Sequence, residues 1–165
     1  MKFQEVDFLI QRTMDSITVR GAVLDDLELL RSFEQGVIQA ERPFDVTLDA
    51  DPISYYDIGA MIEDDDAHVV VAEIGGKVIA SGYALIKPAK PYLVHERYSY
   101  LGFMYTVPEY RGRGVNTKIL EGLKEWSYAK GLKEIRLTVY NGNGSAIRAY
   151  EKAGFKRHII EMRLE

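Results

Sequence analysis

A loop rich in glycine and arginine, between an apolar strand and an amphipathic helix, constrains the fold of this chain most. It lies within residues 106–117, which read TVPEYRGRGVNT, and it joins an expected strand at 98–107 to an expected helix at 115–130. Glycine permits positive φ and lets the backbone approach a ligand closely. The first helical turn leaves N–H groups unpaired at the positive end of the helix dipole. The pattern therefore predicts a cradle for phosphate oxygens.

Two common phosphate-binding loops are excluded by the spacing of these glycines. The chain has no G-x-x-x-x-G-K-[ST] motif, and Gly112 with Gly114 lacks the third glycine of a dinucleotide fingerprint. Neither a P-loop kinase nor a Rossmann fold is therefore expected. By itself, R-G-R-G would also suit a solvated turn with two surface arginines.

A second pattern downstream distinguishes between these interpretations. Residues 139–155 read VYNGNGSAIRAYEKAGF, which indicates a strand end, an Asn/Gly turn, a short helix capped by Asn143 and a Gly-Phe exit. Here the chain resembles the GNAT superfamily of acyl-coenzyme A-dependent N-acetyltransferases. The family motif V-x-x-x-N-x-x-A-x-x-x-Y-x-x-x-G-F is matched in full. The pyrophosphate motif [QR]-x-x-G-x-[GA] is matched from Arg111 onward, except that Asn116 stands at its last position.

The resemblance covers roughly residues 17–155 and implies a mixed α/β (α+β) fold. We expect a central mixed sheet of about six strands with four helices, in which two splayed parallel strands form the acyl-CoA cleft. Periodicity and turn signals predict strands at 17–22, 68–74, 77–86, 98–107, 134–139 and 155–164. They predict helices at about 25–40, 53–63 and 115–130, with a short one after residue 143.

Length and apolar content set the domain organisation. With 165 residues, of which 47% are hydrophobic, the chain can bury one core. We expect a single domain at 17–165 after an N-terminal extension at 1–16. No signal-peptide pattern or membrane-spanning apolar run is present in the sequence, so we expect a cytoplasmic protein that does not contact membranes.

The resemblance also assigns the expected cofactor site. It implies that the pantetheine arm of acetyl-CoA bonds the backbone near Met104 and Thr106, and that Asn143 holds a pantetheine amide. The residues expected around the pyrophosphate are Arg111, Gly112, Arg113, Gly114, Val115, Asn116 and Thr117. Acetyl-CoA is the expected co-substrate, and no metal is expected. Because the chain has no cysteine, an acyl-enzyme on a thiol cannot form, and direct transfer is the simpler route.

The chemistry needs a neutral amine and a protonated leaving thiol. At pH 7 an amine of pKa near 10 is free base in only about one part in 10³, so its deprotonation costs roughly 4 kcal/mol. By resemblance, Tyr150 is the general acid that protonates the thiolate. Some relatives carry a glutamate at the position of Thr138 or Tyr100, but this chain has a carboxylate at neither. The candidates for a base or proton relay are His95, Glu96, Tyr98, Tyr100 and Tyr105, although each would also suit a structural role.

Charge is distributed unevenly along the chain, whose formal net charge is −4. Residues 41–66 hold nine acids and one base, whereas residues 107–165 hold seven acids and twelve bases. The basic half suits a polyanion such as coenzyme A, and the acidic half suits a cationic amine. The candidate acceptor-binding residues are Glu41, Asp45 and Asp57. The acids at 64–66 are interpreted as solvated surface.

Three classes of function remain open at this stage. The first is transfer of an acetyl group from acetyl-CoA to a primary amine of a small molecule, peptide or protein. The second is a non-catalytic acyl-CoA-binding regulatory or interaction protein of the same fold. The third, nucleic-acid binding, is disfavoured by the negative net charge and the lack of a basic aromatic patch.

The segment after the second motif predicts assembly. Many relatives end in a closing two-strand hairpin, whereas only about ten residues follow Gly154 here. Exposed strand edges are usually covered. Residues 1–16 or another subunit would complete the sheet edge, and a homodimer is favoured.

Overall fold

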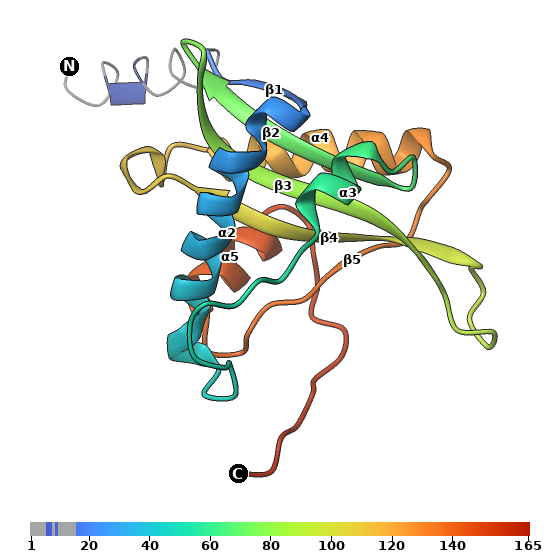
Figure 1. Ribbon diagram of the computed structural model, residues 1–165. Helices are drawn as coiled ribbons and strands as arrows, with labels where there is room; N and C mark the ends of the chain where they lie inside the picture. The colour runs from blue at the N-terminus through green and yellow to red at the C-terminus, as the bar shows by residue number, and fades with distance from the viewer. Residues whose placement is uncertain (1–5, 8, 10–15) are drawn as a thin grey trace.

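The computed structural model describes residues 6–7, 9 and 16–165 (Figure 1). The N-terminal extension expected at 1–16 therefore lies mostly outside the described residues, and its role stays a prediction. Within the described part of the chain, no helix is both long enough and apolar enough to cross a membrane.

A mixed five-stranded sheet organises the described chain. Its strand order is β1-β2-β3-β4-β5; the first three pairs are antiparallel, and β4 and β5 are parallel. The strands are β1 (Thr18–Gly21), β2 (Ala67–Ile74), β3 (Lys77–Pro88), β4 (Arg97–Thr106) and β5 (Ile135–Leu137). The predicted hairpin is confirmed, because β2 and β3 join through Gly75 and Gly76, both at positive φ.

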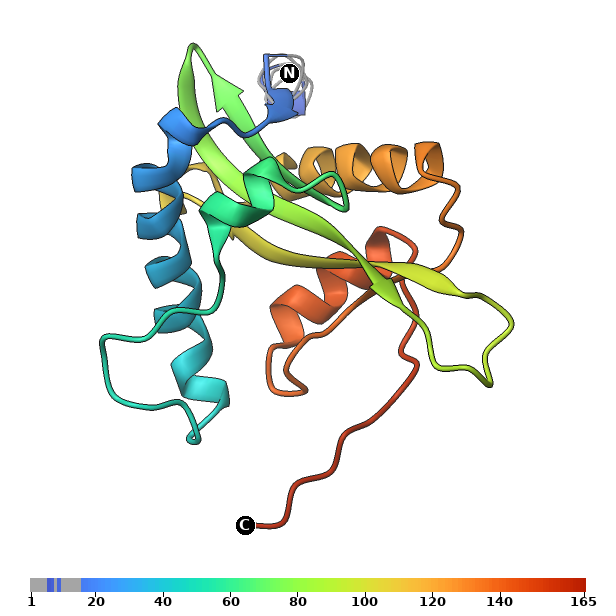
Figure 2. The same cartoon turned by 45° about the vertical axis from the view of Figure 1, so that its right-hand side comes forward.

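Helices cover both faces of this sheet. They are α2 (Leu27–Glu41), α3 (Ile58–Glu63), α4 (Val115–Ala129) and α5 (Gly144–Lys152), with 3₁₀ turns η1 (Leu24–Asp26), η2 (Arg42–Phe44) and η3 (Pro108–Tyr110). Figures 1 and 2 show α2 and α3 on one face and α4 and α5 on the other. The mixed fold with four helices, as expected from the sequence, is therefore confirmed.

Alternation along β2 produces the two cores. Val69 and Val71 pack with the α2 and α3 side chains, whereas Val70 and Ala72 pack with those of α4. All four side chains are at least 97% buried. Because successive strand residues point to opposite faces, one apolar run serves both helical layers.

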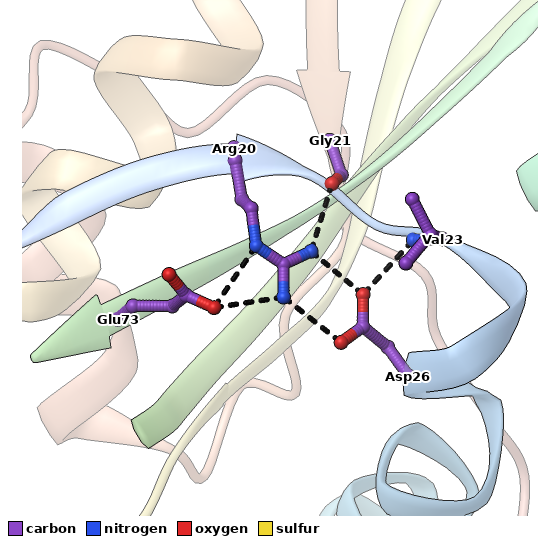
Figure 3. A network of polar contacts seen from close by, with 5 residues as sticks. All are labelled: Arg20, Gly21, Val23, Asp26 and Glu73. Carbon is purple, nitrogen blue, oxygen red and sulfur yellow. Dashed lines mark hydrogen bonds and ion pairs between the residues drawn. The ribbon is translucent and has the colours of Figure 1, made fainter. Parts of the chain in front are cut away.

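An arginine fixes the sheet edge to the start of α2 (Figure 3). Arg20 on β1 donates from Nε and Nη2 to Glu73 Oε1 on β2, at 2.9 and 2.8 Å. It also donates to both oxygens of Asp26, at 2.7 and 2.9 Å, and Asp26 accepts the Val23 N–H. The Arg20 hydrogen bonds hold the pKa of Asp26 below its ordinary value, although burial opposes them.

Two expected elements differ in the structure. The strand predicted at 155–164 is wrong: residues 155–165 have no regular structure, so the described sheet has five strands rather than six. A strand needs an edge to pair with, and this segment pairs with none of the described strands.

The helix predicted at 53–63 begins only at Ile58. The buried carboxylate of Glu34, on α2, accepts the N–H groups of Tyr55 and Tyr56 at 2.6 and 2.8 Å. Because these two N–H groups bond to Glu34, the residues that carry them do not join the helix. Asp57 then caps α3 by accepting the Ala60 N–H.

Candidate active site

β4 and β5 diverge after three residue pairs. Their parallel register ends where Leu101 faces Leu137, whereas β4 continues to Thr106. A bulge helps to redirect β4 here: the β3 register shifts between Ser81 and Tyr83, and Phe103 takes φ of 59°. Beyond Leu101, the edge of β4 that faces away from β3 therefore has no strand partner among the described residues. The splayed parallel strands expected from the sequence are present.

Gly102 is a point of close approach beside this bulge. A Cβ at Gly102 would lie 2.6 Å from the ring of Tyr83. Two expected cofactor residues, Met104 and Thr106, follow on the same unpaired stretch of β4. The Thr106 carbonyl accepts the Arg111 Nε–H at 2.9 Å.

The glycine loop adopts the conformation that its sequence predicts. Gly112 and Gly114 have φ of 71° and 77°, in the left-handed region, and α4 begins at Val115. No side chain caps this helix, so its first N–H groups face the end of the β4 edge without a side-chain acceptor. The arrangement suits an anion, because these N–H groups lie at the positive end of the α4 dipole. Asn116 and Thr117 complete the first turn.

α5 supplies the expected acid. Asn143 caps α5 by accepting the Ala146 N–H at 3.2 Å, which uses its side-chain oxygen. Tyr150 packs against the core beneath the sheet, with its ring 6.1 Å from that of Phe155. Burial, followed by the charges of Glu41 and Tyr100, raises the pKa of Tyr150 to about 12. The hydroxyl therefore keeps its proton at neutral pH, as a general acid requires.

The end of α2 meets the loop that leads from β5 to α5. The rings of Phe44 and Tyr140 stack at 6.4 Å, and the Tyr140 hydroxyl donates to Asp45 Oδ2 at 2.8 Å. Gly142 permits this contact, since a Cβ there would lie 3.2 Å from Phe44. Two expected acceptor residues, Glu41 and Asp45, are thus brought beside the segment that carries Asn143 and Tyr150. The third, Asp57, is the cap of α3.

Glu41 is half-buried among aromatic hydroxyls. Burial raises its pKa and the nearby Asp45 charge adds to the rise, while Tyr55 opposes it. The Tyr55 hydroxyl is buried beside this carboxylate without a hydrogen bond of good geometry within the described chain. Burial also raises the pKa values of Tyr56 and Tyr140, and the Glu41 charge contributes in both cases.

The candidates for a base or relay divide into two groups. Tyr100 lies on β4 where that strand pairs with β5, and its hydroxyl donates to Thr138 Oγ1 at 2.9 Å. His95 and Glu96 instead lie in the loop before β4, at the outer end of the β3–β4 hairpin (Figure 2).

Two further tyrosines on β4 make structural contacts. Tyr98 contacts Arg136, whose guanidinium carbon is 5.2 Å from the ring centroid. Tyr105 packs on Phe33 at 4.9 Å, in space that Gly36 leaves open.

Sequence reasoning missed the tyrosines whose pKa values burial and the Glu41 charge raise. Tyr55 and Tyr56 precede α3, and Tyr140 follows β5, so nothing in the local pattern places them together. The repeated Tyr55-Tyr56 pair was the only available signal.

Comparison with known proteins agrees with this geometry. The model of the acetyltransferase (GNAT) family matches residues 30–155. The thialysine N-epsilon-acetyltransferase of Mus musculus is 32% identical over 99 residues, which cover 53% of this chain and 54% of that protein. The chain thus spans about half the length of that curated relative.

Two solved structures share the fold at low sequence identity. A mutant of the BH1408 protein of Bacillus halodurans has a TM-score of 0.81 and 19% identity, over 90% of this chain and 98% of that one. A predicted acetyltransferase of Clostridium acetobutylicum, solved with acetyl-CoA, has a TM-score of 0.67 and 21% identity, over 90% and 96% of the two chains. The family model spans well over half of the chain, and the splayed strands, glycine loop and α5 lie where its motifs predict; the protein belongs to the GNAT family of acetyltransferases.

Proposed function

We propose that this protein transfers an acetyl group directly from acetyl-CoA to a primary amine of a small molecule, peptide or protein. One observation carries the proposal: the unpaired β4 edge leads to the uncapped N-terminus of α4 behind Gly112 and Gly114. An extended chain of amides that ends in a diphosphate matches both parts of that arrangement.

The cofactor contacts follow from this placement. The pantetheine amides would bond the β4 backbone near Met104 and Thr106, in place of a neighbouring strand. The pyrophosphate would rest on the N–H groups at the start of α4, from Val115 to Thr117. Arg111 and Arg113 would add positive charge beside the loop.

Tyr150 and the absence of cysteine support direct transfer. The amine nitrogen attacks the thioester carbonyl, and the departing thiolate takes a proton from the Tyr150 hydroxyl. No thiol is present in the chain to hold the acetyl group in between.

A cationic acceptor is favoured by the acidic end of α2. Glu41 and Asp45 lie beside the loop that precedes α5, on the side where an acceptor would approach Tyr150. The name of the mouse relative specifies acetylation of the epsilon nitrogen of thialysine, which is an amine.

One observation favours a second candidate, an acyl-CoA-binding protein without turnover. Neither Thr138 nor Tyr100 supplies a carboxylate, and their side chains bond one another. Release of free coenzyme A from acetyl-CoA, measured with a thiol reagent across a panel of primary amines, separates the two candidates. Amine-dependent release supports acetyl transfer. Tight acetyl-CoA binding without release from any amine would support the binding protein.

We also propose a homodimer, which rests on the segment after α5. Four apolar side chains there are at least 76% exposed: Ile159, Ile160, Met162 and Leu164. The outer edge of β5 pairs with no other strand of the described chain. The mass in solution, measured by light scattering, should be twice 18.8 kDa, and Ile160→Lys with Met162→Lys should halve it. A monomeric parent would contradict the proposal.

A further inference from the structure

Two neighbouring carboxylates at the end of α2 lie in opposite environments. Glu41 is the last residue of the helix, and Asp45 follows the 3₁₀ turn that continues it. Asp45 contacts the loop after β5 through the Tyr140 hydroxyl, and the Glu41 charge contributes to the raised pKa of the same tyrosine. Their surroundings differ in burial, in hydrogen-bond donors and in nearby charge.

Asp45 is stabilised as an anion. It accepts hydrogen bonds from the Thr47 N–H at 2.9 Å, from the Thr47 hydroxyl and from the Tyr140 hydroxyl. The Thr47 hydroxyl bond contributes most to lowering the pKa of Asp45, and Arg163 adds a distant positive charge. This carboxylate therefore stays charged throughout the neutral range.

Glu41 is stabilised as the neutral acid instead. It is half-buried and has no ion pair in the described chain, because the adjacent Arg42 pairs with Asp51. It also ends a helix, where the negative end of the dipole disfavours a carboxylate. Burial and the Asp45 charge raise the pKa of Glu41, which makes it the better proton acceptor of the two.

Glu41 influences several tyrosine hydroxyls. After burial, its charge contributes to raising the pKa values of Tyr55 and Tyr56 before α3, of Tyr140 after β5, and of Tyr150 on α5. The ring stacking and the hydrogen bond of Tyr140 hold the end of α2 against the loop that leads to α5. Where two carboxylates sit in environments that push their protonation apart, acid–base roles can be assigned to them.

We propose that Glu41 takes the proton from the acceptor's ammonium group, while Asp45 is the permanent anion that holds the ammonium beside it. This inference rests on the proposed acetyl transfer and assigns its missing base. The sheet offers no comparable group, since the Tyr100 hydroxyl donates to Thr138 and Lys87 Nζ lies 3.9 Å from the Tyr100 ring centroid.

The steps balance as follows. The ammonium gives its first proton to the Glu41 carboxylate, which later releases it to water. The freed nitrogen lone pair forms the C–N bond at the thioester carbonyl. When the C–S bond breaks, Tyr150 protonates the sulfur, and the second nitrogen proton restores the tyrosine. The products are an amide, a free thiol and one proton.

The test uses the full chain, acetyl-CoA and the best primary amine from the panel. For the parent, kcat/KM should rise as Glu41 ionises and then stay level up to the amine pKa near 10. Glu41→Gln should lower kcat about 100-fold at pH 7. Its kcat/KM should rise tenfold per pH unit up to the amine pKa, because only pre-formed free amine reacts. Glu41→Asp should restore part of the level region.

Asp45→Asn and Asp49→Asn separate charge binding from proton transfer. Asp45→Asn should raise the amine KM with kcat near pH 7 retained, and it should move the rise of kcat/KM to lower pH, because the Asp45 charge raises the pKa of Glu41. Asp49→Asn, an exposed neighbour on the same loop, should leave all parameters unchanged. Acetyl-CoA affinity, measured by calorimetry, should match that of the parent in all variants. An unchanged affinity shows that the variants are folded.

Two outcomes would overturn the proposal in distinguishable ways. A parent-like kcat and pH profile in Glu41→Gln, with amine turnover intact, would refute the role of Glu41 alone. No turnover of any amine by the parent would refute the proposed function and this assignment with it.

Discussion

Substitution of Gly114 tests whether the start of α4 is the diphosphate site. Gly114 precedes the helix with φ of 77°, and its neighbours in the helix offer unpaired N–H groups. An aspartate there places a negative charge where we expect phosphate oxygens. At a hundredfold excess over its dissociation constant, acetyl-CoA should stabilise the parent by about 2.7 kcal/mol. For a chain of this size, that corresponds to a rise in Tm of roughly 5–10 °C. In Gly114→Asp the rise should disappear.

The strain of the substitution has to be separated from its charge. A side chain in the left-handed region costs about 1–2 kcal/mol of folding stability whatever its charge. Gly131 offers a matched control, since it follows the other end of α4 with φ of 78° and a Cβ there would meet no atom within 4 Å. Gly131→Asp should lower the Tm without ligand by at least as much as Gly114→Asp does, because it adds the same strain and its charge lies at the negative end of the α4 dipole. It should keep the full acetyl-CoA-induced rise.

The assay is thermal unfolding with and without acetyl-CoA, supported by calorimetric titration. Gly114→Ala should bind more weakly than the parent but more tightly than Gly114→Asp, because it adds strain without charge. If Gly114→Asp shows the same acetyl-CoA-induced rise in Tm as the parent, the diphosphate does not bind at α4. The assignment of the glycine loop would then be wrong.

Two further predictions concern Tyr150 and Asp26. Tyr150→Phe should lower kcat by about 100-fold and leave acetyl-CoA affinity unchanged, because only the proton donor is lost; steady-state kinetics that retain full kcat would return Tyr150 to a packing role. The pKa of Asp26 is lowered in the folded state, so its ion pair with Arg20 contributes stability above the unfolded pKa of 3.8, and that stability is lost as pH falls below it. Urea unfolding between pH 2 and 5, roughly bracketing that pKa, should give a flatter dependence for Asp26→Asn than for the parent. Equal slopes would show that the pair contributes nothing.

Glycines at the ends of helices and in turns made much of the fold predictable. The start of α4 at Val115 and its end before Gly131 are marked in the sequence by glycines, Gly114 and Gly131. The β2–β3 turn follows from Gly75 and Gly76 in the same way. Such signals depend on the residue's own backbone preference, so they need no knowledge of distant contacts.

The start of α3 could not be predicted because its cause lies far away in the chain. Glu34 is about 20 residues upstream of the N–H groups that it binds, those of Tyr55 and Tyr56. The apolar spacing of 53–63 suits a helix, but the buried Glu34 carboxylate binds N–H groups of the expected first turns, and α3 begins only after them. Tertiary hydrogen bonds of this kind override local propensity.

The strand predicted after Gly154 was wrong for a different reason. Its apolar and charged residues alternate as in a strand. Alternation indicates which residues would share one face, but it does not identify a strand with which the segment could pair. The described chain offers the open edge of β5, yet the segment does not pair with it. An alternating pattern and an open edge are therefore not enough to predict a strand.

The absence of a carboxylate at positions 100 and 138 is best explained together with the end of α2. At Tyr100 and Thr138 the chain places two hydroxyls that bond one another, and Lys87 adds a positive charge above the tyrosine ring. A base at that site would have its pKa lowered by the cation and would be a weak proton acceptor. Glu41, half-buried at the negative end of a helix and near the charge of Asp45, meets the opposite conditions. Under the proposed mechanism, the acidic stretch that attracts an ammonium group would also contain the carboxylate that takes its proton, so acceptor binding and deprotonation would be tied to one end of α2.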